Sequence, residues 1–116
     1  MILRASREDV LADLLDLFLQ GIGHKAAALN PEMNWDRLKS EYAKWNGVCA
    51  QKLGESFEGA AREPCLEIFF GPDIEGNLPY RATAVGAVQE LRRLYDERLD
   101  ALRRVRGDLG EAAGAG

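Results

Sequence analysis

The feature that most constrains this chain is a long amphipathic stretch near its C-terminus, residues 82–109. Its apolar residues recur every three or four positions, which is the spacing of one side of an α-helix. They are Val85, Val88, Leu91, Tyr95, Leu99, Leu102, Val105 and Leu109. The positions between them are mostly charged or polar. A helix of about seven turns with one apolar side must pack on other apolar surface, so the residues before it have to supply that surface.

Length and composition predict one globular domain. The chain has 116 residues, of which 47% are hydrophobic and 29% are charged, as is usual for a soluble protein. A chain of this size can bury a core without disulfides or metals to hold it. We expect a single helical domain over residues 1–106. Residues 107–116 are rich in glycine and alanine, and we expect a flexible tail there.

Charge and cysteine content limit the kinds of partner that the protein can bind and the cellular compartment in which we expect it. The net charge is −4 and the isoelectric point is near 5.0, which argues against direct nucleic-acid binding because that needs many basic contacts to phosphates. Cys49 and Cys65 are too few for a secreted disulfide scaffold. The most apolar run, Val10–Ile22, is interrupted by two aspartates and is too short to cross a membrane. We therefore expect a cytoplasmic protein that does not bind membranes.

A first helix is predicted over residues 6–21. Ser6 can cap it, with acidic residues in its first turn. Its apolar residues, which cover about half of the helix circumference, are Val10, Leu11, Leu14, Leu15, Leu17, Phe18 and Ile22. Gly21 and Gly23 weaken a helix, so we expect it to end near residue 21, followed by a short turn. The alternative is that it continues through the alanines to Leu29.

A second helix is predicted over residues 33–58. Its apolar stripe keeps its phase across Gly47 and Gly54, which favours one helix over two; the stripe consists of Trp35, Leu38, Tyr42, Trp45, Cys49, Leu53 and Phe57. We interpret its aromatic residues as core, with an interface as the alternative. The third helix is predicted over residues 81–107.

Between the second and third helices we predict a short extended segment or β-hairpin near residues 65–83. Cys65–Phe70 is the most strand-like run, Gly71–Pro79 is dense in turn residues, and Tyr80–Thr83 could return as a second short strand. The fold class is therefore mainly α: a three-helix, bundle-like single domain with this small segment inserted.

No pattern in the chain predicts catalysis, a metal site or a cofactor. His24 is the only histidine, and neither cysteine has a neighbour at metal-ligand spacing. We expect a protein that is not an enzyme. The alternative is a small-ligand-binding protein or enzyme that uses the 71–80 loop, with Asp73, Glu75 and Tyr80, together with His24.

Two surfaces are candidates for binding a protein partner. The first is the loop after the second helix, with Phe69, Phe70, Ile74 and Leu78 as apolar anchors. The alternative for Ile74 and Leu78 is that they cover the end of the bundle. The second surface is a row of carboxylates on the first helix, Asp9, Asp13 and Asp16, which would suit a basic partner; the alternative is that this row is an ordinary solvated helix face.

Self-association is also predicted. The second and third helices carry wider apolar sides than a narrow coiled-coil seam needs, so a homodimer would cover surface that three helices leave open. Arg98 lies on the edge of the apolar stripe of the third helix. Its charge would reach solvent or meet an acidic group, including one in another subunit.

In its short length, acidity and lack of catalytic residues, the chain resembles accessory proteins. It is similar in the same respects to the small inhibitors that phages and mobile elements direct at host machinery, among which are the anti-CRISPR proteins. This resemblance implies a non-enzymatic adaptor or inhibitor that binds a larger protein.

Overall fold

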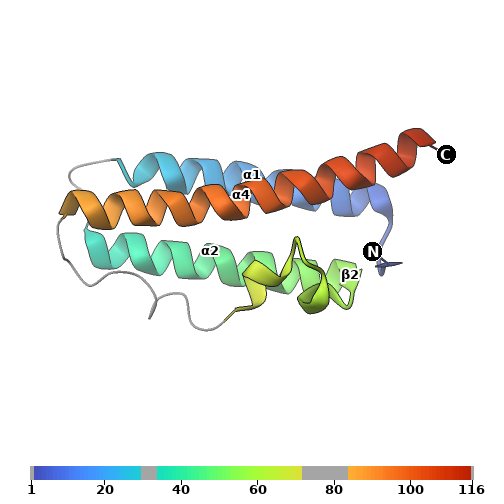
Figure 1. Ribbon diagram of the computed structural model, residues 1–116, viewed down its shortest axis with the longest axis horizontal. Coiled ribbons are helices and arrows are strands. Elements are labelled where there is room, and N and C mark those ends of the chain that lie inside the picture. The colour runs from blue at the N-terminus through green and yellow to red at the C-terminus, as the bar shows by residue number, and fades with distance from the viewer. Residues whose placement is uncertain (1, 30–33, 72–83, 116) are drawn as a thin grey trace.

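The computed structural model of the protein describes residues 2–29, 34–71 and 84–115. Its main helices are α1 (Arg7–Ala27), α2 (Trp35–Ser56) and α4 (Ala84–Ala115). They run side by side along the long axis of the molecule, with α1 antiparallel to the other two (Figure 1). α1 contacts both α2 and α4. The predicted fold class, a mainly helical single domain built on three helices, is confirmed.

α1 begins as predicted and ends later than predicted. The Ser6 hydroxyl accepts a hydrogen bond from the Asp9 amide at 3.2 Å, which satisfies one free amide of the first turn. The helix then continues through Gly21 and Gly23 to Ala27, so the expected end near residue 21 is wrong. Gly21 is buried against α2 and α4. This tertiary packing outweighs the cost of about 1 kcal/mol that glycine imposes on a helix.

α2 is a single helix, as the continuous phase of its apolar stripe predicted. Its N-terminus is capped by Asn34, whose side-chain oxygen accepts a hydrogen bond from the Asp36 amide at 2.8 Å. At its C-terminus the chain leaves the helix as the two-residue strand β2 (Phe57–Glu58). β2 pairs antiparallel with β1 (Ile2–Leu3), with Leu3 opposite Phe57. This pairing anchors the N-terminal segment to the end of α2.

The short segment predicted after the second helix is present, but Cys65–Phe70 is not extended, because Cys65 and Leu66 lie in a turn and Glu67–Phe70 form a 3₁₀ helix. Two short 3₁₀ helices, η1 (Ala60–Arg62) and η2 (Glu67–Phe70), follow β2. Leu66 and Phe69 are 0% and 2% exposed, and their separation of three residues matches one 3₁₀ turn. A strand would have placed them on opposite faces. Residues 72–83, where the return strand was expected, lie outside the described residues.

α4 is longer than the predicted helix, 81–107. It extends to Ala115, and Leu109 is only 7% exposed. Helical structure therefore covers residues 107–115 of the segment that we expected to be a tail. The flexibility of residues 107–116 stays a prediction.

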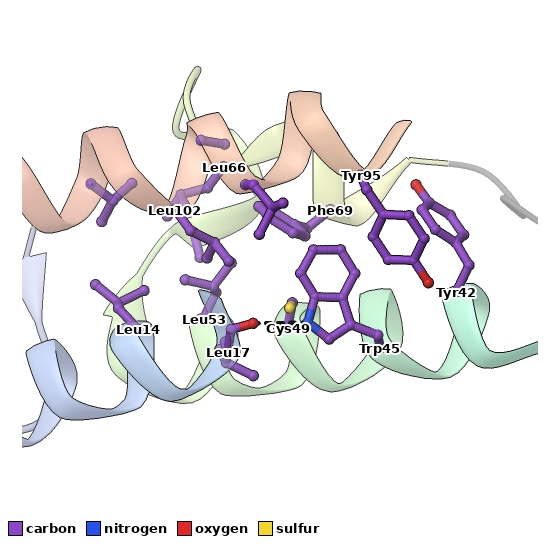
Figure 2. Close-up of a cluster of buried hydrophobic side chains, with 14 of the residues drawn as sticks. Leu14, Leu17, Tyr42, Trp45, Cys49, Leu53, Leu66, Phe69, Tyr95 and Leu102 are labelled. Carbon is purple, nitrogen blue, oxygen red and sulfur yellow. Dashed lines mark hydrogen bonds between the residues drawn. The ribbon is translucent and has the colours of Figure 1, made fainter. Parts of the chain in front are cut away.

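The core lies where the inward sides of the helices meet the 3₁₀ segment (Figure 2). Tyr42 and Tyr95 pack edge to face with ring centroids 4.8 Å apart, and the ring centroids of Trp45 and Tyr95 are 5.3 Å apart. The indole N–H of Trp45 donates a hydrogen bond to the Leu17 carbonyl at 3.0 Å. Tyr42 and Trp45 are thus core residues, as predicted.

Arg98 is buried inside this core, and its charge meets an acidic group of the same chain, because Nη1 lies 3.8 Å from the Glu97 carboxylate. Arg98 is 5% exposed, and its Nε donates to the side-chain oxygen of Asn46 at 2.8 Å. Asn46 in turn donates to the Phe69 carbonyl at 3.3 Å, and Arg98 Nη2 donates to the Ile68 carbonyl at 3.4 Å. Burial lowers the pKa of the Arg98 guanidinium from its ordinary value. The two side chains fasten η2 to α2 and α4.

Candidate functional site

α1 and the turn that follows it carry two rows of apolar or small residues, and only one of these rows is covered. The buried row packs into the core and consists of Val10, Leu14, Leu17, Gly21 and Ala28. The exposed row, which we call the outer stripe, consists of Ala12, Leu15, Leu19, Ile22, Ala26 and Leu29. At 3.6 residues per turn, the two rows point to roughly opposite sides of the helix. α1 is therefore apolar both toward the core and away from it.

The large residues of the outer stripe are well exposed to solvent. Leu19 and Leu29 are 56% and 58% exposed, and Leu15 and Ile22 are 36% and 44% exposed. Val48 on α2, at 43%, is the remaining large apolar residue with comparable exposure among the described residues. Single exposed apolar residues are common, whereas a continuous row of them marks an interaction surface.

The spacing of the outer stripe is that of a coiled-coil seam. Its members are separated by three, four, three, four and three residues, which alternates like the a and d positions of a heptad repeat. Knobs at these positions insert between side chains of a facing helix. The shape that best complements the outer stripe is therefore another α-helix.

The predicted carboxylate row forms one edge of the same surface. Asp9 and Asp16 are exposed and Asp13 is half-buried; at 3.6 residues per turn all three lie between the outer stripe and the buried row. Asp16 accepts a hydrogen bond from Gln20 at 2.9 Å. The structure thus places the predicted acidic face beside an apolar surface that the sequence analysis did not separate from the core.

The opposite edge of the outer stripe borders α4. Lys25 near the end of α1 forms an ion pair with Asp96 of α4, and Phe18 is half-buried on the same side. A positive charge on this edge is therefore already paired. The negative charge of this surface comes from the carboxylates on its other edge.

The predicted apolar anchors after α2 are placed differently. Phe69 is 2% exposed, and its ring packs edge to face against Trp45 with centroids 6.4 Å apart. It is therefore a core residue, and the prediction that it is an exposed anchor is wrong. Phe70 is half-buried at the end of η2. Ile74 and Leu78 lie outside the described residues, so the loop that they belong to stays a prediction.

His24 lines a small cavity between α1, α2 and α4. The cavity has a volume of about 230 Å³ and is lined by His24, Ala27, Arg37, Leu38, Glu41 and Tyr95. The His24 and Tyr95 rings stack at 6.4 Å with 14° between their planes. Pockets for drug-sized ligands usually start at about 300 Å³, so this cavity could hold only a smaller molecule. Asp73, Glu75 and Tyr80, which we expected beside His24, lie outside the described residues.

The thiols are held in their unreactive, protonated form. Cys49 is fully buried, and burial raises the pKa of its thiol to about 12. Burial also raises the pKa of the half-buried Cys65. A thiol reacts as the thiolate, so neither cysteine is set up as a nucleophile. In the described part of the chain, no group of three histidine, cysteine or acidic residues is arranged to hold a metal ion.

Sequence analysis missed the outer stripe because it counted Leu15 and Ile22 with the core side of the helix. A signal was present, since residues 12 to 29 contain a second three–four repeat that is out of phase with the buried one.

No helix in the described ranges is long and apolar enough to cross a membrane. Comparisons of the chain with protein-family models, curated proteins and solved structures find no match.

Proposed function

We propose that this protein is a non-enzymatic interaction module that binds a helix of another protein chain through the outer stripe of α1. The observation that carries the proposal is the exposed heptad repeat, in which Leu19 and Leu29 are more than half exposed. Exposed apolar area of this kind lowers the free energy of a complex by roughly 25 cal/mol for each Å² removed from water. An accessory or inhibitory role is the form of this function that we favour.

The ionisable groups of the core support a structural role for the rest of the fold. Arg98 is occupied by Asn46 and two backbone carbonyls. Cys49 is buried and protonated. These buried groups help to hold the bundle together. The surface of α1 differs from them, because its apolar side chains and its carboxylates are accessible to solvent.

The proposal can be tested with two synthetic helical peptides of the length of α1, 21 residues. Both have leucine at the a and d heptad positions; one has lysine at the flanking positions and the other has glutamate. Each peptide repels its own copies, so neither forms a coiled coil with itself. Binding is measured by fluorescence anisotropy with the protein at low concentration. We expect the lysine peptide to bind at least about ten-fold more tightly, because it complements Asp9, Asp13 and Asp16.

A matched pair of variants locates the binding surface. Leu19→Glu with Ile22→Glu places two charges in the middle of the outer stripe, whereas Val48→Glu places one on an equally exposed site of α2. We expect the first variant to lose peptide binding and the second to keep it. If neither peptide binds the unmodified protein, or if the stripe variant binds as well as the control, the proposed function is wrong.

A second candidate function, small-ligand binding, is favoured by the cavity at His24. Arg37 and Glu41 bring a guanidinium and a carboxylate to the same small cavity, and together they would suit a zwitterion of amino-acid size. The test is a titration with free amino acids followed by nuclear magnetic resonance. Shifts at the cavity that disappear in Arg37→Ala with Glu41→Ala would support this function, and their absence would remove it.

A further inference from the structure

We infer that the helix that occupies the outer stripe is α1 of a second copy of this chain, packed antiparallel about a two-fold axis between Leu19 and Ile22. The inference rests on the proposed function, because it names the occupant of the same surface. It differs from the sequence-based expectation of a homodimer, which assigned the interface to the second and third helices. In this arrangement the part of the seam that lies on α1, from Ala12 to Ala26, is about 21 Å long, at 1.5 Å per residue.

The first argument is the distribution of large and small residues. Reading the stripe forward gives Ala, Leu, Leu, Ile, Ala and Leu, and reading it backward gives Leu, Ala, Ile, Leu, Leu and Ala. An antiparallel pair therefore sets Ala12 against Leu29 of the second copy, Leu15 against Ala26, and Leu19 against Ile22. Each small residue meets a large one, which lets successive layers fill the space between two helices evenly.

The same pairing is a regular coiled-coil arrangement. If Ala12 is an a position, then Leu19 and Ala26 are also a positions, while Leu15 and Ile22 are d positions; Leu29 continues the repeat in the turn that follows α1. Every layer of the antiparallel pair then joins an a position to a d position. A parallel pair in register would set alanine against alanine in two of its layers and would leave gaps there, at a cost that grows with the cavity volume.

The second argument is the placement of charge. In the antiparallel pair, Asp16 lies beside Gly23 of the second copy and about 14 Å along the axis from the other Asp16. Asp13 and Asp9 are farther from their own counterparts. These separations exceed the screening length of about 10 Å at moderate salt. In a parallel pair in register, each aspartate would lie at the same height as its counterpart.

The mass of the protein in solution is the primary test. Light scattering coupled to size exclusion, over roughly 1–100 µM, should give twice the chain mass of 12.8 kDa. Leu19→Glu with Ile22→Glu should return the mass to that of a single chain while circular dichroism shows the same helix content. Val48→Glu should remain dimeric.

Disulfide trapping tests the orientation, in a background in which Cys65 is replaced by serine and Cys49 stays buried. Chains with Leu15→Cys are mixed with chains with Ala26→Cys under mild oxidation. The antiparallel pair predicts a rapid disulfide between the two kinds of chain and little crosslinking of either kind alone. Efficient crosslinking of Leu15→Cys with itself would show a parallel pair and would overturn the inference.

The outcomes separate this inference from the proposed function. A monomeric mass over the whole concentration range overturns the dimer, but loss of lysine-peptide binding in the stripe variant would still support the interaction surface. A dimer that survives Leu19→Glu with Ile22→Glu has its interface elsewhere and also overturns the inference. A protein that neither dimerises nor binds the peptide contradicts both.

Discussion

The two faces of α1 show how far tertiary structure can separate residues that look alike in sequence. Leu14 and Leu15 are neighbours of the same type, yet Leu14 is 2% exposed and Leu15 is 36% exposed. Both belong to rows with three–four spacing. Hydrophobic spacing therefore identifies residues that can be buried against a helix, and it does not say which helix buries them or whether that helix belongs to the same chain.

The two faces differ in what they can accept. The inner face has Gly21 opposite Trp45, so the indole ring reaches the helix backbone and donates a hydrogen bond to the Leu17 carbonyl. The outer face has larger side chains at its centre, Leu19 and Ile22, and no buried polar contact with the described residues. A core within one chain requires a face shaped for one specific neighbour, as the inner face is. A contact between two chains requires a regular seam, as the outer face is.

The largest expected contrast is between Leu14→Ala and Leu15→Ala. The first opens a cavity in the core and should lower the free energy of unfolding by about 3 kcal/mol. The second removes exposed surface and should cost less than about 1 kcal/mol. Urea unfolding at a protein concentration low enough to keep the chain monomeric measures both. Equal losses would show that the inner and outer faces are not distinguished as described.

A second contrast concerns pH, through the thiol of Cys49 in the core. Its pKa is raised by burial to about 12, above the value of about 8.5 in an unfolded chain. The stability that comes from keeping it protonated is complete below about pH 8.5 and is lost as the pH rises toward 12. We expect a loss of about 2 kcal/mol between pH 8 and pH 10 from this group. Cys49→Ala should flatten the dependence of stability on pH in this range, whereas an unchanged slope would contradict the assigned cause.

The two glycines of α1 should respond in opposite directions to the same substitution. A Cβ atom at Gly21 would lie 2.5 Å from the Trp45 ring and 2.7 Å from Leu99, while one at Gly23 would meet nothing within 4 Å. Gly21→Ala should therefore lower the free energy of unfolding by about 1–2 kcal/mol. Gly23→Ala should raise it by up to about 1 kcal/mol through helix propensity. Thermal unfolding of the two variants gives the comparison, and a gain at both sites would mean that Gly21 is not tightly packed.

The smallest expected effect concerns a polar atom in the core. The Tyr42 hydroxyl is buried and has no hydrogen-bond partner among the described residues, and burial raises its pKa. Tyr42→Phe should leave the free energy of unfolding unchanged or raise it by about 1 kcal/mol, because it removes an unsatisfied group and keeps the ring. Urea unfolding measures this effect. A clearly lower free energy of unfolding in the variant would indicate that the hydroxyl forms a hydrogen bond in solution.

Much of the fold could be predicted from the sequence because helix signals are local. Ser6 and Asn34 mark two helix starts through caps that involve residues only two or three positions away. The phase of the α2 stripe identified one helix across Gly47 and Gly54. The end of α1 and the form of Glu67–Phe70 could not be predicted, because each depends on distant residues: Trp45 and Leu99 pack on Gly21, and Arg98 and Asn46 hold η2.

Less of the candidate site could be predicted. The carboxylates Asp9, Asp13 and Asp16 were recognised from their spacing, and their exposure agrees with that interpretation for Asp9 and Asp16. The outer stripe beside them was not recognised, since its leucines were indistinguishable from core leucines. Phe69 was expected near the binding surface, and it is instead buried against Trp45.

By itself, the sequence determined where the three long helices lie and which residues are apolar enough to need a neighbour, because helix signals are local and apolarity belongs to the side chain itself. Only the tertiary structure decided which side of α1 faces the core. That choice depends on Trp45, Leu99 and the other residues that meet the helix from far along the chain. One row of α1 was covered by those residues and the other was left in solvent, where we propose that a second chain binds it.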